Sequence, residues 1–254
     1  MLYRKILNMG ILRELFKRRL LRKNIVLSRP PGQFSVGEYK LRRLQQRGFV
    51  VERAVDGGAA EGGWTASLKE VYPNAAILAV EPREDAQIHL QQLGRNLSKV
   101  VIAQTLLGAE TGQVPFHVSK EQSSVLLSNE SGHVGKVRDC PITTMDELVE
   151  RLNFGYPDLI KLDLQGYELT ALKGATRCMR HAQAVLLEVS FLPFYQGMPL
   201  LYDVVTFMHD QGYELYDVWG LWHRPLDGAL AQGDVLFLKA DHPLRKDHRW
   251  SQNG

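Results

Sequence analysis

A glycine-rich turn follows a short hydrophobic segment that ends in an acid. The segment is Ala54-Val55-Asp56, and the turn extends from Gly57 to Gly63. Glycines let a ligand approach the backbone closely, and the helix expected behind them offers unpaired N–H groups and the positive end of its dipole. The turn therefore predicts a site for a nucleoside-containing cofactor, although tight packing of a strand on a helix would also need glycines. The residues expected to contact the cofactor here are Asp56, Gly58, Ala59, Gly62, Trp64 and Thr65.

A second acid stands at the end of the next hydrophobic segment. Residues 76–80 have the pattern of a buried strand, and Glu81 follows them. A carboxylate at that position can accept hydrogen bonds from both hydroxyls of a ribose. Gln104 and Thr105 end the third predicted strand, where they either border the adenine ring or have a purely structural role.

The spacing of the glycine turn bears on which cofactor it binds. A dinucleotide-binding turn usually reads Gly-x-Gly-x-x-Gly directly after the strand. This chain instead has Gly57-x-Ala59-x-x-Gly62, with Asp56 in front of it. Many methyltransferases place an acid at the end of the first strand, where it meets the charged methionine ammonium of S-adenosylmethionine (SAM) or ordered water. The sequence therefore favours SAM, and a nicotinamide or flavin dinucleotide is the alternative.

Two further carboxylates end hydrophobic segments and are the candidate catalytic residues. Asp163 follows residues 159–162, and Glu188 follows residues 185–187. Ligands of open α/β sheets bind at the carboxyl ends of the strands, so both acids are expected at the site. A hydroxyl group of a substrate is a poor nucleophile near neutral pH. Asp163 is therefore predicted to act as a general base that accepts the proton of such a hydroxyl. Alternatively, Asp163 orients the SAM ammonium or caps the next helix. Glu188 is expected to contact the substrate.

Several polar residues complete the candidate site. Gln165, Glu168 and His223 are the candidate substrate-binding residues, although a glutamate near a helix start is favourable whatever its function. Ser124 lies in the polar segment 119–135 and is expected to close over the cofactor, because loops this long often line an active site. No cluster of His, Asp and Glu has the spacing of a metal site, so the enzyme is predicted to be metal-independent.

Elements must position these residues, and strand and helix patterns alternate from Phe49 onward. Such alternation predicts a parallel sheet with helices on both faces. A hairpin is expected at residues 110–112, and Gly94 and Gly174 are expected to end helices. The predicted strands are 50–56, 76–81, 99–105, 114–118, 159–163, 184–189, 213–218 and 235–239. The predicted helices are 36–46, 64–71, 83–93, 168–173 and 200–211, with a short one that begins at Thr144.

Composition and charge limit the class of protein. The chain has 254 residues, of which 44% are hydrophobic and 23% charged, as expected of one α/β domain with an appendage. Residues 1–24 hold eight Lys or Arg and only one acid, so this leader carries +7 and the rest of the chain −4. The body shows no basic face, which argues against nucleic-acid binding. The leader is expected either to pack as a lid or homodimer contact, or to bind an anionic membrane surface or an acidic partner.

The sequence also indicates a compartment. No hydrophobic run is long enough to cross a membrane, and the basic N-terminus lacks the uninterrupted hydrophobic core of a secretory signal. Cys140 and Cys178 lack a metal-type spacing and are expected to be free thiols in a reducing environment. A cytoplasmic location is therefore predicted.

Taken together, several segments resemble the FkbM-type methyltransferase family. The resemblance extends in order from Val55 to Phe237, and its most diagnostic block is Asp163-Leu164-Gln165-Gly166-Tyr167-Glu168. The chain departs from the family at Ala60, where Asn is usual, and at Gly57, where an aliphatic residue is common. The other segments that carry the resemblance are Val55-Asp56-Gly57-Gly58-Ala59, Gly62, Thr65, Val80-Glu81-Pro82, Ser123-Ser124-Val125-Leu126 and Thr144-Met145-Asp146.

The resemblance implies a class I methyltransferase fold, with a mostly parallel seven-stranded sheet, an antiparallel C-terminal strand and helices on both faces. It also implies a SAM-dependent enzyme that methylates a hydroxyl of a sugar or secondary metabolite, free or carrier-linked. The alternatives are an N-methyltransferase, a nicotinamide-dependent oxidoreductase, or a SAM-binding adaptor without activity. The predicted organisation is a basic helical extension at 1–48, a SAM-binding domain at 49–242 and a polar tail at 243–254.

Overall fold

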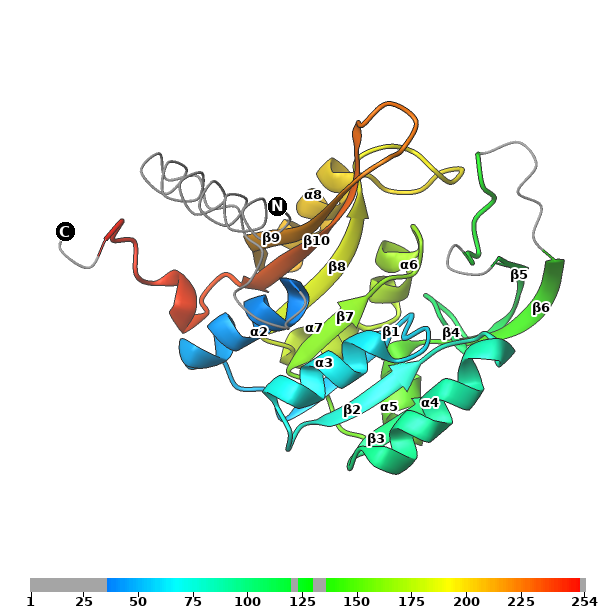
Figure 1. The fold of residues 1–254 in the computed structure, drawn as a ribbon, viewed down its shortest axis with the longest axis horizontal. Coiled ribbons are helices and arrows are strands. Elements are labelled where there is room, and N and C mark those ends of the chain that lie inside the picture. Colours follow the sequence, from blue (N-terminus) through cyan, green and yellow to red (C-terminus); the bar gives the residue numbers. More distant parts are fainter. Residues whose placement is uncertain (1–35, 120–122, 130–135, 252–254) are drawn as a thin grey trace, which may run out of the picture. The chain divides into compact units, whose positions relative to one another are not determined.

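The computed structural model of the chain describes residues 36–119, 123–129 and 136–251 (Figure 1). The basic leader 1–24, for which a lid, dimer or membrane role is predicted, lies outside the described residues. Helix α2, Val36–Gln46, coincides with the helix predicted there. Among the described residues, none of the helices combines the length and the hydrophobicity needed to traverse a bilayer.

A seven-stranded sheet forms the centre of the molecule (Figure 1). Its strands lie in the order β3-β2-β1-β7-β8-β10-β9. The first five of these are parallel, whereas β10 is antiparallel to both of its neighbours. This topology confirms the predicted fold class. The strands are β1 Arg53–Gly57, β2 Ala76–Val80, β3 Val100–Ala103, β7 Leu159–Leu162, β8 Ala184–Ser190, β9 Tyr213–His223 and β10 Leu230–Lys239.

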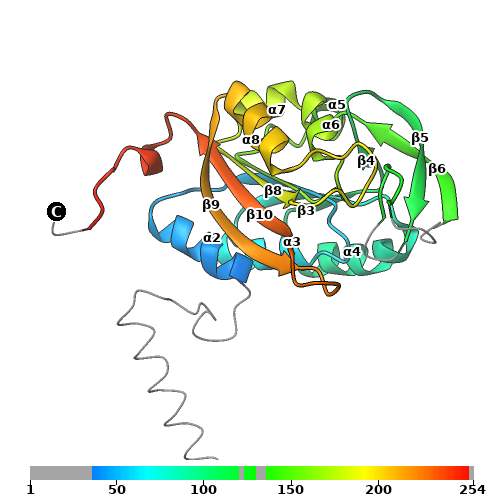
Figure 2. The ribbon, with the colours of Figure 1, turned by 90° about the horizontal axis from the view of Figure 1, so that it is seen from above.

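Helices cover both faces of this sheet (Figure 2). Successive strand residues face opposite sides, so Ala54 packs toward α2 and α3, whereas Val55 packs toward α5 to α8. Strand β2, Ala-Ile-Leu-Ala-Val, is hydrophobic along its whole length because both of its faces are buried. Leu90 of α4 packs on Ala79, on the same face as α3. The helices are α3 Gly63–Val71, α4 Glu84–Asn96, α5 Met145–Arg151, α6 Glu168–Lys173, α7 Thr176–His181 and α8 Leu201–Asp210, followed by the 3₁₀ helix η1, Pro243–Arg245.

A second, three-stranded sheet stands beside the first. It consists of β4 Leu106–Leu107, β5 Gly112–Val118 and β6 Lys136–Thr143, in the order β4-β6-β5. The hairpin predicted at residues 110–112 is wrong, because the strands on either side of that turn do not pair with each other. Strand β6 lies between them, parallel to β4 and antiparallel to β5.

Two glycines that were expected to end helices behave differently. Gly94 lies inside α4, which continues to Asn96, so that prediction is wrong. Gly174 does end α6. A Cβ there would lie 2.1 Å from the carbonyl oxygen of Gly108, so glycine is required for space. Thr144 caps the predicted short helix, since its hydroxyl accepts a hydrogen bond from Glu147 N at 3.1 Å.

Candidate active site

The glycine turn after β1 rests on the ends of two neighbouring strands. The N–H groups of Gly58 and Ala59 both donate to the carbonyl of Val80, at 3.0 and 3.1 Å. Gly58 has a φ of +73°, and a Cβ on it would lie 1.9 Å from the carbonyl oxygen of Asp163. Only glycine fits a position with both restrictions. The turn is therefore locked between the ends of β2 and β7.

The next residues of the turn face different surroundings. Ala60 adopts a left-handed φ of +47°, and its N–H donates to Glu81 Oε2 at 2.9 Å. Gly62 has a φ of +88°, and a Cβ there would meet Leu93 of α4 at 2.5 Å. Close packing of the turn against α4 thus explains Gly62 structurally.

Glu81 lies directly after β2 and is only 5% exposed. Its Oε1 accepts hydrogen bonds from the backbone N–H of Arg83 at 3.0 Å and from the Arg83 side chain at 3.2 Å. Its Oε2 accepts one from Ala60. A carboxylate offers about four acceptor positions. The protein donors occupy three of them, so one position on Oε2 is left for a ribose hydroxyl.

Asp56 is buried beneath the turn rather than open to a ligand. Its exposure is 0%, Thr65 donates to it at 2.7 Å, and the ammonium of Lys161 lies 3.1 Å from its other oxygen. Lys161 also donates to the carbonyl of Gly58 at 3.1 Å. Burial by itself lowers the pKa of Lys161, but the carboxylates of Asp56 and Asp163 outweigh it, so the pKa is raised above its ordinary value. The contact of Asp56 with a methionine ammonium stays a prediction.

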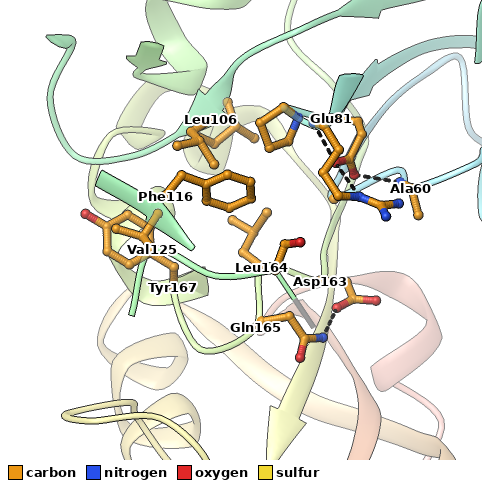
Figure 3. Close-up of a pocket in the computed structure, with 14 residues that line it drawn as sticks. Ala60, Glu81, Leu106, Phe116, Val125, Asp163, Leu164, Gln165 and Tyr167 are labelled. Atoms are coloured by element: carbon orange, nitrogen blue, oxygen red, sulfur yellow. Dashed lines mark hydrogen bonds and ion pairs between the residues drawn. The ribbon is translucent and has the colours of Figure 1, made fainter. Parts of the chain in front are cut away.

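A cavity of about 230 Å³ opens at the carboxyl ends of β1, β2 and β7 (Figure 3). Ala60 and Glu81 lie on one side of it, and Asp163 and Gln165 lie at its lower edge in that view. The opposite wall is apolar and comes largely from the small sheet and the segments packed on it, through Leu106, Leu107, Phe116, Val125 and Tyr167. These residues fit SAM, because a carboxylate suits a ribose and a flat apolar wall suits adenine.

Several predicted cofactor contacts lie outside the lining of this cavity. Gln104 and Thr105 border a separate hollow of about 310 Å³, and Thr105 donates to the carbonyl of Pro141 at 3.0 Å. Ser124 is buried and donates to the backbone carbonyl of Gln165 at 2.9 Å, so it fixes a loop instead of facing the cavity. Its neighbour Ser123 does line the cavity. Ala59, Gly62, Trp64 and Thr65 pack into the surrounding core.

Gln165 joins the two candidate catalytic carboxylates. Its side-chain amide donates to Asp163 Oδ1 at 2.9 Å and to Glu188 Oε2 at 2.8 Å. Its amide oxygen accepts a hydrogen bond from the Tyr195 hydroxyl at 3.2 Å. Gln232 also donates to Glu188 Oε2, at 2.9 Å. The structure therefore brings Asp163, Gln165 and Glu188 together, as the sequence predicted. The backbone of Gln165 has a left-handed φ of +53°.

The carboxylates around this bridge crowd one another. Burial, followed by the charges of Asp163 and Glu168, raises the pKa of Glu188 to about 9. Asp234 lies opposite Glu188 in the β8–β10 pair, and burial together with Asp163 raises its pKa to about 6 against the opposing charge of Lys161. The surroundings therefore favour the neutral form of Glu188, a carboxyl group that can donate a hydrogen bond.

Glu168 and His223 lie away from the cavity that Asp163 lines. Glu168 is buried, and its Oε1 accepts hydrogen bonds from the N–H groups of Leu164 at 2.7 Å and Gly166 at 3.2 Å. Burial raises the pKa of Glu168 to about 7, although these N–H groups favour its charged form. It thus shapes the loop after β7. His223, at the end of β9, borders a second cavity that also touches Gln165.

The described residues hold no group of three or more His, Cys, Asp and Glu side chains arranged to bind a metal ion. Independence from metal stays a prediction. The two cysteines, Cys140 and Cys178, are buried free thiols.

A family of known proteins matches the part of the chain that builds this site. The methyltransferase FkbM domain matches residues 56–215, which is more than half of the chain. The chain belongs to the methyltransferase FkbM domain family. This confirms the resemblance that the sequence carried, over residues 56–215 of the stretch from Val55 to Phe237.

Two known proteins are similar to this chain. The hexuronic acid methyltransferase AglP of Haloferax volcanii is 28% identical over 118 residues, which are 45% of this chain and 47% of that protein. The crystal structure of methyltransferase FkbM from Methylobacillus flagellatus KT has a TM-score of 0.50 at 21% identity, over 74% of this chain and 43% of that chain. This likeness shows the fold. The chain thus matches about half the length of both relatives.

Sequence reasoning missed three polar residues of the site. Lys161 could have been noticed because it is a lone cation inside a hydrophobic strand. Asp234 could have been noticed because it is an acid directly before the hydrophobic run 235–238. Gln232 carried no such signal. Asp234 and Gln232 both lie in β10, beyond the residues 56–215 that match the FkbM domain.

Proposed function

We propose that the protein is a SAM-dependent methyltransferase that transfers a methyl group to a hydroxyl oxygen of a sugar or secondary metabolite, free or carrier-linked. The observation that carries the proposal is the cavity that places Glu81 opposite Asp163 at the carboxyl ends of β2 and β7, in a chain of the FkbM family. The name of its relative AglP, a hexuronic acid methyltransferase, supports a carbohydrate acceptor.

The residues that would hold SAM are those that line the first cavity. The remaining acceptor position on Glu81 suits a ribose hydroxyl, and the wall of Leu106, Leu107 and Phe116 suits the adenine ring. Backbone groups at Gly58 and Ala60 border the same space. Bound SAM supplies a methyl group on a positively charged sulfur, and the sulfur keeps the bonding electrons when the acceptor oxygen takes the methyl.

The chain itself has to orient the hydroxyl and remove its proton. Asp163 is the better base of the two catalytic candidates, because the pKa of Glu188, near 9, leaves that carboxyl already protonated at neutral pH. The amide of Gln165 donates to Asp163 Oδ1 at 2.9 Å, and the ammonium of Lys161 lies 3.9 Å from Oδ2. Asp163 lines the cavity and has further acceptor positions for the proton of a hydroxyl. Glu188, as a neutral carboxyl, can donate a hydrogen bond to the Asp163 carboxylate or to the acceptor.

Calorimetric titration tests the proposal through the cofactor. S-adenosylhomocysteine, the demethylated product, is expected to bind the purified protein with micromolar affinity, and NADPH is expected not to bind. Because Glu81 is the ribose-binding candidate, Glu81→Gln is expected to weaken S-adenosylhomocysteine at least tenfold. Tight NADPH binding without S-adenosylhomocysteine binding would assign the cavity to a dinucleotide and end the proposal.

A further inference from the structure

A second cavity of about 710 Å³ lies beyond Gln165. The loop after β8, the β9–β10 hairpin and residues 128–129 enclose it. Both loops lie at the same end of the main sheet (Figure 1). Among the residues that the structure describes, Gln165 is the one that borders both this cavity and the cavity assigned to the cofactor. The two cavities therefore meet at the Gln165 side chain.

The walls of the second cavity are well fixed. The N–H of Asn129 donates to the carbonyl of Phe194 at 2.8 Å, and its side-chain amide donates to the carbonyl of Pro193 at 2.9 Å. Tyr195 bonds to Gln165, and Gln232 bonds to Glu188. These contacts tie three separate segments into one frame around the space. The cavity is thus a formed site with hydrogen-bonding groups in its inner wall.

The chemistry of these walls combines aromatic faces with neutral polar groups. Trp222 is 65% exposed, although a tryptophan normally buries most of its ring, and it borders the cavity together with Phe194 and Tyr195. The inner wall presents the amides of Gln165 and Gln232. Gln165 uses both amide hydrogens on Asp163 and Glu188, so it offers its oxygen as an acceptor, whereas Gln232 uses one on Glu188 and can both donate and accept. An aromatic face beside amides suits a ring that carries C–H groups on its faces and hydroxyls on its edge.

The charged groups around the second cavity indicate whether it suits a neutral or an acidic ring. The cation at the rim, Arg224, is held by Asp227 through two hydrogen bonds of 2.8 and 2.6 Å, so its charge is already balanced. On the inner side, an anionic ligand would approach the carboxylate of Asp163. Burial and the nearby acids raise the pKa of Tyr195 to about 12, so its hydroxyl stays uncharged. The site therefore favours a ligand without charge.

We propose that the second cavity binds a neutral sugar ring as the methyl acceptor, with one face of the ring stacked on Trp222 and its hydroxyls toward Gln165 and Gln232. This inference rests on the proposed function and assigns its acceptor site. Trp222 is then the residue that selects a ring-shaped polyol, and Gln165 lies beside the place where a hydroxyl of that ring meets the methyl donor.

Saturation-transfer NMR with methyl β-D-glucopyranoside, in the presence of S-adenosylhomocysteine, tests the proposal. The glucoside is expected to bind the wild type, and Trp222→Ala is expected to weaken this binding about tenfold or more, because the stacked face is lost. Trp222→Phe keeps an aromatic face and is expected to stay within about threefold of the wild type. Trp250→Ala is the matched control, since Trp250 is fully exposed in the tail and lines neither cavity.

The same samples separate the possible failures. S-adenosylhomocysteine affinity is expected to be equal in all four proteins, and its absence in the wild type would point to failure of the proposed function. If the cofactor product binds but the glucoside does not, or binds equally to Trp222→Ala, the acceptor assignment is overturned. Tighter binding of methyl β-D-glucopyranosiduronic acid than of the glucoside would overturn the choice of a neutral ring. Tighter binding of cyclohexanol would overturn the choice of a sugar.

Discussion

At the scale of single residues, Ala60 is the position where this chain departs from its family with a visible physical consequence. Its φ of +47° lies in the left-handed region, which costs an ordinary L-residue about 1 kcal/mol and which asparagine tolerates better. Asparagine is also the usual residue of the family at this position. The backbone at position 60 thus keeps a conformation that suits asparagine, although this chain has alanine there.

The substitution Ala60→Asn is therefore expected to stabilise the protein by about 0.5–1 kcal/mol, because it relieves this backbone preference. Ala60→Val is the opposite control, since a β-branched residue is disfavoured in the left-handed region and should destabilise. Urea unfolding monitored by circular dichroism measures both. A lower unfolding free energy for Ala60→Asn than for the wild type would contradict this interpretation of the turn.

At the scale of elements, the turn between β1 and α3 depends on how closely three strand ends meet. Gly58→Ala places a methyl group 1.9 Å from the Asp163 carbonyl at a φ of +73°. The expected loss of stability is about 3 kcal/mol or more, together with loss of S-adenosylhomocysteine binding. Gly63→Ala is the matched control, because nothing lies within 4 Å of a Cβ there and Gly63 begins α3.

The control substitution Gly63→Ala is expected to raise the free energy of unfolding by up to about 1 kcal/mol, since alanine is the better helix former. Thermal unfolding and calorimetry of both variants provide the comparison. Equal behaviour of the two variants would show that the turn does not need the tight contact with β7.

Much of the fold could be predicted from the sequence, because strands buried on both faces are marked by hydrophobic runs such as 76–80 and 184–187. The small sheet could not. Strand β6 contains Lys136, Arg138 and Asp139, and its partner β5 precedes it by more than a dozen residues, so neither hydrophobicity nor a short turn indicates the pairing. Gly94 was misread because a single glycine is tolerated within a helix as regular as α4.

The candidate site could be predicted in part for a similar reason. Asp163, Gln165 and Glu188 stand at strand ends or just after them, and the parallel topology brings strand ends together. The partner of Asp56 could not be foreseen, because Lys161 comes from a strand about a hundred residues away in the chain. The neutral state of Glu188 depends on burial and on Asp163 together, which only three-dimensional packing reveals.

At the scale of the whole molecule, the buried acids predict how stability varies with pH. A carboxyl whose pKa is raised on folding binds a proton more tightly in the folded state than in the unfolded state. Its contribution to stability is therefore lost as the pH rises from the unfolded toward the folded pKa. Asp234 and Glu168 complete this change by about pH 6 and 7, whereas Glu188 continues to about pH 9. Between pH 7 and 9, Glu188 is thus the main buried acid that lowers stability.

The substitution Glu188→Gln preserves the shape of this side chain and removes its titration. The wild type is expected to lose up to about 1.4 kcal/mol per pH unit relative to this variant between pH 7 and 9. Urea unfolding of both proteins at pH 7, 8 and 9 measures the difference, and groups common to both cancel. Parallel curves over this range would show that Glu188 is already ionised at pH 7.

The most direct test of the whole account compares catalysis with cofactor binding in Asp163→Asn. This variant keeps the hydrogen bond from Gln165 but removes the base, so turnover with a sugar acceptor is expected to fall by about 10²–10⁴-fold. S-adenosylhomocysteine affinity, measured by calorimetry on the same preparation, is expected to stay within about threefold of the wild type. Asp210→Asn, an exposed change at the end of α8, is the control and should alter neither. Unchanged turnover in Asp163→Asn, or a loss of affinity as large as the loss of turnover, would contradict the assignment of Asp163 as the base.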